Sequence, residues 1–497
     1  MIVMKFGGRA LSSAQRIKEV GRIIRSRLSS SSVIVVSAFS GVTDRLDQLA
    51  RYAAERGSAG SPPSLPRGGK IASLASLRRY HQKIINNLGL SAVSAQAGAG
   101  PPIEPLWKEL ELALKGITLL RELTPRTRDY VLSFGERFAS RVIAHFLAGE
   151  GLPAQALDAF RIGLKTDSNF GSAHPLPGSA GAIRKNLAPL LRGKKIPVIT
   201  GFIGKDRKGE ITTLGRDGSD YTASFIGAAL GAREIQIWRD LPGIMTGDPA
   251  IVKNARLVKA ITLNEASELV HYGNGVLHPY MLAPAVAKGI PVRLLNILQP
   301  TSTGTLITDK RPVCPVCVRT RTGRRATLTA SELAQAGGTG RLDKTPVKAI
   351  AYKKDVVLVN IFSPELFYHR GLVGRVFEIL RRYGVFIHML TSSEINVSFS
   401  TDSATPELRQ ALKEISRFAL PQLVQHKAVI CVIGEGIKRN RVLMADILTA
   451  LRPAGIKIEL ISYDMTRTNL TMLVSNNIAT KIVRLLHQKL FGKRRIR

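Results

Sequence analysis

The sequence is poor in cysteine, in aromatic residues and in acidic residues. It has 3 cysteines in 497 residues, which argues against a disulfide scaffold and for a reducing compartment, so we expect a cytoplasmic protein. The N-terminal residues MIVMKFGG lack the apolar region of a signal peptide. No apolar run reaches the length of about 18 residues that a transmembrane helix needs, so no membrane association is expected.

The shortage of acids leaves 36 acidic side chains against 72 basic ones, a net charge of +36. The excess is densest in residues 306–345 and 481–497, and the second stretch carries seven basic residues and no acid. Such a charge would fit a nucleic-acid partner. However, aromatic residues make up 6% of the chain, and no RNA-binding or zinc-finger signature is present, which argues against nucleic acid. A scaffold that binds polyanions through this linker and tail is the competing class.

The hydrophobic fraction of 44% is high enough for ordinary globular cores. At about 150 residues per domain, the length predicts roughly three domains. Over the first 300 residues, short apolar runs alternate with helical patterns, which predicts an α/β sandwich with a largely parallel sheet. The strands are expected at Ile2–Phe6, Val33–Ala38, Ala154–Ala159, Pro197–Phe202, Glu234–Trp238 and Val292–Asn296, and helices at Ala14–Leu28, Tyr130–Leu147 and Tyr221–Leu230.

Residues 57–69 and 93–102 are rich in glycine, proline and serine, and we expect exposed loops there, on either side of a helical hairpin over 70–90. His81 in this hairpin is expected at the surface. Residues 308–345 indicate a linker, and Cys314 and Cys317 lie within it. Zinc needs four ligands and the sequence offers no second pair nearby, so a reduced pair is expected, with a metal site shared across a dimer as the alternative.

After the linker the pattern changes to two similar units. The first has expected strands at Val347–Val359 and Ile395–Ser400 with a helix over Gly371–Tyr383 between them. Two consecutive β-α-β-β-like units predict a pair of small α+β modules. The second unit has expected strands at Ala428–Val432, Ile456–Ile461 and Leu470–Val474, and helices at Arg441–Leu451 and Ile478–Leu490.

Three glycine-containing turns stand next to these elements. Lys5-Phe6-Gly7-Gly8 stands at the end of the first strand, residues 37–44 (SAFSGVTD) follow the second, and residues 213–220 (TLGRDGSD) open a helix. Glycines there free backbone N–H groups to face an anion, and a helix N-terminus adds positive potential. One such turn is more often only a turn, but turns at the carboxyl ends of parallel strands meet at one rim of the sheet. Lys5 is then placed to neutralise a transferring phosphoryl group.

Two charged residues have the chemistry to hold an amino acid beside this predicted phosphate-binding site. Glu136, in a helical pattern, is either a solvated helix acid or a carboxylate that binds an ammonium group. Arg216, in the third turn, suits a bidentate contact with a carboxylate. Together with a phosphate cradle they describe a site that phosphorylates an amino acid.

In order and spacing, several blocks resemble those of the aspartate kinases: KFGG, VVSAFSGVTDRL, SFGERFAS, TTLGRDGSDYTA, IWRDLPGIMTGDP and VLHP. In the second half, VKAIAYKKDVVLVNIFSP, TSSEINVSF and AVICVIGEGI resemble the tandem ACT domains of that family. The resemblance spans nearly the whole chain. It implies an amino-acid-kinase-type αβα sandwich with a mostly parallel sheet at residues 1–307, the linker at 308–345, and ferredoxin-like ACT modules at 346–420 and 421–497.

The resemblance also implies a reaction. The family transfers the γ-phosphoryl group of ATP, with Mg²⁺, to the side-chain carboxylate of L-aspartate, and so opens the synthesis of lysine, threonine, methionine and diaminopimelate. The implied catalytic residues are Lys5, Gly8, Gly41 and Asp220. Thr43, Glu136, Arg216 and Ser219 would bind aspartate, and Gly7, Trp238, Arg239, Asp240, Met245 and Asp248 would bind the nucleotide. The nucleophile is the substrate carboxylate, which needs no general base, so catalysis is alignment and charge neutralisation.

The chain departs from the family pattern mostly on the nucleotide side. Arg9 and Ala10 stand where the family usually has Thr-Ser, Asp217 replaces a glycine, and Arg239 replaces a threonine. Met245, Ala250 and Gly275 stand where tyrosine, arginine and lysine are usual. We therefore expect a working aspartate kinase in which Arg9 and Arg239 replace lost positive charge. The alternative is a weak or inactive paralogue kept for regulation or assembly.

The ACT pair implies an amino-acid effector, lysine or threonine, and a homodimer, because family members pair these modules across subunits. The effector loops of the family fall on Gly371, Ser393, Glu394 and Asn396. His388 stands where an aspartate is frequent, which puts lysine in doubt, because an acid suits an ε-ammonium group and a neutral imidazole does not. The second unit reads Ser462-Tyr463-Asp464-Met465-Thr466 where a glycine-containing turn is usual, so that module is expected to be structural.

Overall fold

The computed structural model describes residues 1–28, 31–55, 73–90, 102–271, 279–308, 346–363, 371–393, 395–440, 442–452, 455–463 and 468–492. It divides into two compact units, Met1–Gly243 with Leu277–Lys310 and Ile244–Val276 with Arg311–Arg497. The residue boundaries expected from the sequence stay a prediction. Cys314 and Cys317, together with almost all of the loops and linker expected at 57–69, 93–102 and 308–345, lie outside the described residues.

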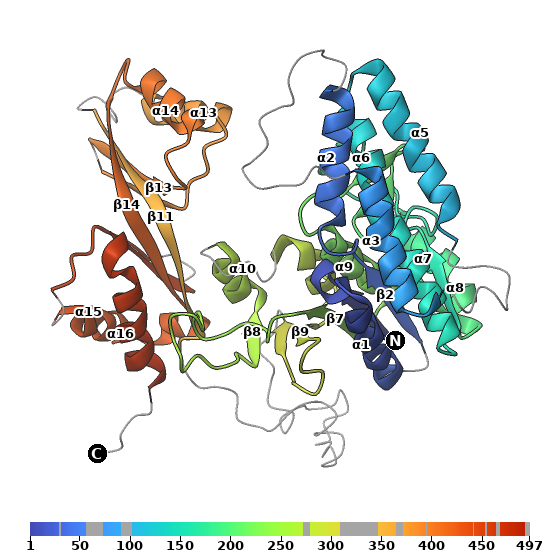
Figure 1. The fold of residues 1–497 in the computed structure, drawn as a ribbon. Coiled ribbons are helices and arrows are strands. Elements are labelled where there is room, and N and C mark those ends of the chain that lie inside the picture. The colour runs from blue at the N-terminus through green and yellow to red at the C-terminus, as the bar shows by residue number, and fades with distance from the viewer. Residues whose placement is uncertain are drawn as a thin grey trace, which may run out of the picture. The chain divides into compact units, whose positions relative to one another are not determined.

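The first unit is built on a mostly parallel sheet with the strand order β3-β4-β2-β1-β7-β9-β10 (Figure 1). Neighbouring strands pair in parallel except for the last pair, β9 and β10, which is antiparallel. Strands β1, β2 and β4 are buried along their whole length, as expected where helices cover both faces of a parallel sheet. The strands are β1 Ile2–Phe6, β2 Ser32–Val36, β3 Ala154–Leu157, β4 Ile196–Thr200, β7 Glu234–Arg239, β9 Val292–Asn296 and β10 Thr305–Thr308.

Helices cover both sides of this sheet. One hydrophobic core joins it to α1 (Ala14–Arg27), α2 (Val42–Glu55), α3 (Leu74–Asn87), α5 (Glu104–Leu120) and α7 (Phe134–Gly149). Met4 and Phe6 belong to this core, and because successive strand residues point to opposite faces, Lys5 points the other way. On that side lies α9 (Gly218–Leu230), which contacts β1, β2 and β7. The unit also contains α6 (Pro125–Leu132), α8 (Ser179–Arg192), α11 (Ala283–Val286) and the hairpin of β5 (Ile203–Lys205) and β6 (Ile211–Thr213).

Three expectations for this unit were wrong. The helix expected over Tyr130–Leu147 is two helices, α6 and α7, which break at Ser133, whose hydroxyl bonds back to the Tyr130 carbonyl at 2.6 Å and so competes with the helix backbone. The hairpin expected over 70–90 holds one helix, α3, in the residues described there. His81 is 1% exposed instead of lying at the surface, because α3 packs its ring among Phe39, Trp107 and Phe138.

The second unit contains an antiparallel sheet with the order β12-β13-β11-β14-β16-β15 (Figure 1). Its long strands β11 (Ala349–Phe362) and β14 (Leu420–Ile433) pair with each other at the centre. Val357, Val359 and Ile361 of β11 pack with the helices of the first module, whereas Ile350 of the same strand packs with those of the second. The remaining strands are β12 Met389–Ser392, β13 Asn396–Thr401, β15 Leu460–Tyr463 and β16 Asn469–Ser475, and the helices are α13 Leu372–Arg382, α14 Pro406–Ile415, α15 Leu443–Leu451 and α16 Ala479–Phe491.

Residues from the middle of the chain share the core of the second module. Ile251 and Val252 pack with residues of α15 and α16, and the Thr246 hydroxyl lies 2.9 Å from Nε2 of His487. This segment also forms β8 (Ala260–Thr262) and α10 (Leu263–His271). In α10, one carboxylate oxygen of Glu265 accepts the backbone N–H of Glu435 at 2.7 Å. The segment is therefore fixed by side-chain and backbone contacts to the C-terminal part of its unit.

Two further observations bear on expectations from composition. Cys431, the cysteine within the described residues, is free and buried in β14. Among the residues described, no helix combines the length and the apolar character that crossing a bilayer would require.

Candidate active site

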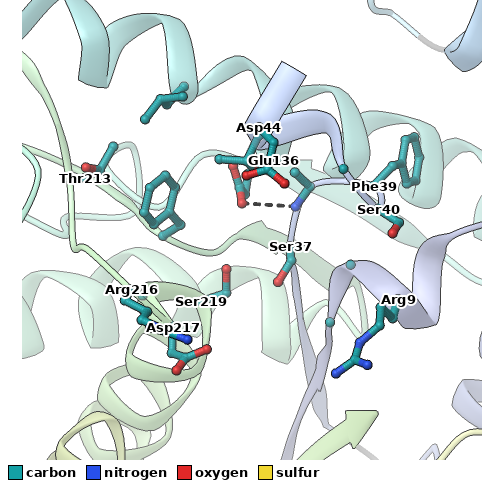
Figure 2. Close-up of a pocket in the computed structure, with 18 of the residues that line it drawn as sticks. Arg9, Ser37, Phe39, Ser40, Asp44, Glu136, Thr213, Arg216, Asp217 and Ser219 are labelled. Carbon is teal, nitrogen blue, oxygen red and sulfur yellow. Dashed lines mark hydrogen bonds between the residues drawn. The ribbon is translucent and has the colours of Figure 1, made fainter. Parts of the chain in front are cut away.

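A cavity of about 590 Å³ opens in the first unit at the carboxyl ends of β1 and β2 and at the N-terminus of α9 (Figure 2). All three glycine-containing turns line it, as the sequence predicted. Arg216, Asp217 and Ser219 lie together on one side, and Arg9 lies on another, beneath Ser40 (Figure 2). The predicted site residues in its wall are Lys5, Gly7, Gly8, Gly41, Thr43, Glu136, Arg216, Ser219, Arg239 and Asp240.

Lys5 is held at the cavity by a buried carboxylate. Its ammonium lies 2.6 Å from Oδ1 of Asp220, which is fully buried in the first turn of α9. The second oxygen, Oδ2, bonds the guanidinium of Arg239 at the end of β7. Burial pushes the pKa of Asp220 upward, but the charges of Lys5 and Arg239 outweigh it and hold that pKa below its usual range. Asp220 is therefore an anion shared by two cations.

Two glycines allow close packing around Ala38, which follows β2. A Cβ on Gly8 would lie 2.9 Å from the Ala38 carbonyl oxygen, and one on Gly135 would lie 2.7 Å from the Ala38 Cβ. Any larger residue would push the turn after β1 or the start of α7 away from β2. Gly41 has a φ of +72°, a left-handed conformation that glycine adopts without strain. The glycines of KFGG and GER thus allow close packing against Ala38, whereas the glycine of SGV allows the backbone conformation of its turn.

This packing brings Glu136 into the cavity wall. Its Oε1 accepts the backbone N–H of Ala38 at 3.0 Å (Figure 2), and its Oε2 is buried without a hydrogen-bond partner. Burial raises the pKa of Glu136 to about 8, although the Ala38 hydrogen bond and the charge of Lys5 oppose the rise. A buried acceptor that lacks a donor is the arrangement expected for binding a substrate ammonium group.

Asp129 in α6 fixes a different part of the wall and was not anticipated from the sequence. Its Oδ2 accepts the backbone N–H groups of Gly171 at 2.8 Å and Thr213 at 2.7 Å, and its Oδ1 accepts the Thr213 hydroxyl at 2.9 Å. Asp129 is 1% exposed, and burial raises its pKa. It thereby ties the loop at Gly171 to Thr213, the last residue of β6, after which the chain continues to Gly215 and Arg216. Its partners lie 42 and 84 residues away in the chain, so no local pattern marks it.

Other predicted nucleotide residues lie elsewhere. Trp238 is fully buried. Its ring stacks on that of Phe6 with 6.1 Å between the ring centroids, and the guanidinium carbon of Arg27 lies over it, 5.0 Å from its centroid. Met245 and Asp248 belong to the second unit, where Met245 forms an isolated bridge with Leu257. Their roles in nucleotide binding stay a prediction.

The predicted effector residues lie in the first module of the second unit. Gly371 precedes α13 with a φ of +107°, and the N–H of Ser393 donates to the carbonyl of Asn396 at 2.8 Å. Glu394 lies outside the described residues. Nearby, Nε2 of His388 lies 2.9 Å from Asp402, which also pairs with the ammonium of Lys353. Burial lowers the pKa of His388 despite Asp402, which favours the neutral imidazole.

Comparison with known proteins agrees with this geometry. The model of the amino acid kinase family matches residues 1–296, and an ACT domain model matches residues 430–490. The chain is 32% identical to "Aspartokinase 2, chloroplastic" of Arabidopsis thaliana, over 98% of this chain and 84% of the relative. Escherichia coli aspartokinase III is 27% identical in two solved structures. Its complex with aspartate and ADP has a TM-score of 0.74, covering 99% of this chain and 100% of that one. Its complex with lysine and aspartate has a TM-score of 0.76, covering 99% of each chain.

Proposed function

The chain belongs to the amino acid kinase family, within it to the aspartokinases, and we propose that its cavity transfers the γ-phosphoryl group of ATP to the side-chain carboxylate of L-aspartate through the residues described above. The observation that carries this assignment is the pairing of a buried Lys5–Asp220 ion pair with a buried, partly unpartnered Glu136 in one cavity wall. The ion pair would stabilise the transferring phosphoryl group, and Glu136 would bind the amino acid.

Aspartate would be held at both ends. The carboxylate of Glu136 receives the substrate ammonium group, and the guanidinium of Arg216 receives the α-carboxylate. Thr43 and Ser219, both in the wall, supply hydroxyl groups. This leaves the side-chain carboxylate free to attack the γ-phosphorus in line. Because that carboxylate is ionised near neutral pH, no residue has to remove a proton.

Lys5 would neutralise the charge that spreads over the phosphoryl oxygens in the transition state. The backbone N–H groups after β1 and at the start of α2 add donors on the same side. Asp220 acts through Lys5, because it fixes the ammonium at 2.6 Å and is itself fully buried. Position and charge thus account for catalysis.

Mg²⁺ would accompany the nucleotide. The described residues hold no group of three or more His, Cys, Asp or Glu side chains placed for a metal. In kinases Mg²⁺ is bound mainly by substrate phosphates with one or two carboxylates. Both oxygens of Asp220 are already paired. Asp240, with a quarter-exposed carboxylate in the cavity wall, fits this role. The ion would neutralise phosphate charge when it is bound.

The assay that tests the assignment is hydroxamate formation from aspartate, ATP and hydroxylamine. The purified full chain should form it with MgATP, and Glu136→Gln should raise the KM for aspartate. If no hydroxamate forms with MgATP, MnATP or GTP, the chain is the inactive paralogue instead.

The second unit would bind an amino acid, lysine or threonine, and inhibit the kinase. The cytoplasm stays the expected compartment. We further propose a homodimer through the ACT sheet. Its edge strands β12 and β15 carry the exposed apolar side chains Leu390, Ile461 and Tyr463, and an edge strand also presents unpaired backbone groups. The combined change Leu390→Lys and Ile461→Lys should yield a monomer by light scattering, and an unchanged mass would refute this interface.

A further inference from the structure

The Lys5–Asp220 pair is part of a longer chain of charges. Asp220 is fully buried and bonds Lys5 with one oxygen and Arg239 with the other. Nη2 of Arg239 also lies 4.0 Å from Oδ1 of Asp217. The four side chains alternate in sign, from Lys5 through Asp220 and Arg239 to Asp217. Three of them, Lys5, Arg239 and Asp217, line the cavity.

Asp217 occupies a backbone position that disfavours an aspartate. It precedes α9 with a φ of +54°, a left-handed conformation that most side chains avoid and glycine adopts freely. The same turn already has glycines on both sides, Gly215 with a φ of +78° and Gly218. The carboxylate of Asp217 is one-third exposed and approaches Nη2 of Arg239, the same nitrogen that bonds Asp220. Its value to the site is therefore electrostatic.

We propose that Arg239 is a positioning residue for phosphoryl transfer and that Asp217 is its counter-charge, so that the two residues form one coupled pair. This inference rests on the proposed function. Arg239 binds one oxygen of the Asp220 carboxylate. Less of the negative charge of Asp220 is then available to neutralise the ammonium of Lys5 beside the cavity. Asp217 balances the added guanidinium, and the four side chains sum to zero.

The charge balance of these four side chains predicts how single substitutions affect binding of the nucleotide phosphates. Without Arg239, two carboxylates face one ammonium, and the excess negative charge lies where the nucleotide phosphates must bind. Without Asp217, the excess is positive and phosphates are attracted. Without both, Lys5 and Asp220 remain a neutral pair. The loss caused by removing Arg239 should therefore depend on whether Asp217 is present.

A double-mutant cycle tests this with Arg239→Gln, Asp217→Gly and their combination in the full chain. We expect Arg239→Gln to lower kcat/KM for MgATP by about tenfold or more, and the combination to recover most of that loss. The KM for aspartate should change by less than about threefold in all variants. Arg239→Lys, which keeps the charge, should retain more kcat than Arg239→Gln.

Arg9→Gln is the matched control. Arg9 is also an arginine in the cavity wall, but it pairs with Asp240 at 3.3 Å. Its effect should add to that of Asp217→Gly without coupling. If the effects of Arg239→Gln and Asp217→Gly are additive, the two residues are not coupled. If Arg239→Gln lowers the thermal midpoint and the combination does not restore it, the loss of activity is a loss of stability, and the proposed coupling is refuted as well. A wild-type chain without hydroxamate activity would instead refute the proposed function.

Discussion

The carboxylate of Glu136 accepts the backbone N–H of Ala38 at 3.0 Å, and this contact joins the first turn of α7 to the end of β2. Burial raises the pKa of Glu136 to about 8. Below that pH the free protein holds a neutral carboxyl group, which cannot pair with an ammonium group. Binding aspartate must therefore remove a proton, and affinity for aspartate should rise with pH up to about 8.

We expect the KM for aspartate to fall by up to about tenfold per pH unit between pH 6 and pH 8. Initial rates at saturating MgATP measure it. Glu136→Gln should abolish this dependence while raising KM throughout, and a wild-type KM that is flat over the same range would contradict the role of Glu136.

His81 gives a second pH dependence, in the free energy of unfolding. Burial lowers its pKa from 6.5 to about 4, so between these values the unfolded chain binds a proton that the folded chain does not. Stability is complete above pH 6.5 and is lost as the pH falls toward 4, by at most about 3 kcal/mol. Thermal midpoints at pH 7 and pH 5 should differ less in His81→Phe than in the wild type. Equal differences would refute this assignment.

Asp129→Asn should loosen the loops that carry Thr213 and Gly171. An amide has one oxygen, so if that oxygen keeps both backbone N–H groups, the NH₂ group meets the Thr213 hydroxyl, which now donates to Oδ1. The carboxylate that accepts all three bonds is lost as well. The loss should be about 2 kcal/mol in unfolding free energy, with a KM for aspartate raised about tenfold and kcat changed less. Kinetics and thermal melting measure both.

Asp167→Asn serves as its control, because Asp167 accepts backbone N–H groups of Asn169 and His174 in the neighbouring turn but is nearly half exposed. It should leave the KM for aspartate close to that of the wild type. If both variants raise that KM alike, the effect does not come from the loops that Asp129 joins.

Gly135→Ala should separate α7 from β2. Its Cβ would lie 2.7 Å from the Ala38 Cβ, and such overpacking costs about 1–3 kcal/mol. The displacement would also weaken the Glu136–Ala38 contact and raise the KM for aspartate. Gly149→Ala, at the other end of the same helix, would meet no atom within 4 Å and should be tolerated. Alanine favours a helix more than glycine does, so comparable losses in the two variants would show that the contact with Ala38 is not the cause.

Titration calorimetry with lysine and with threonine tests the regulatory unit. We expect heat from at least one, and His388→Asp should favour lysine, because it places an acid where the neutral imidazole now stands. The change also leaves Asp402 paired with Lys353. If titration with lysine and with threonine gives no heat of binding, the proposed amino-acid effector is refuted.

The sequence was most informative where neighbours in the chain act together. Lys5 ends a strand that is buried throughout and Gly7 and Gly8 follow it, and this turn together with the two other glycine-containing turns marked an anion site. The sequence was least informative where partners are distant. Nothing local distinguishes Asp129 from a surface acid, and the burial of His81 depends on Trp107 and Phe138, which come from other helices. The break at Ser133 depends on a single hydroxyl contact, which periodicity does not register.

The packing of Ile251 and Val252 into the core of the second module sets a limit on how the protein can be shortened. A fragment that stops at residue 307 would keep this segment but discard α15 and α16, and the two side chains would face water. Thr246 would also lose His487, and Glu265 would lose Glu435. A stand-alone kinase fragment would therefore need new side chains on this segment, and its failure to express would say nothing about catalysis.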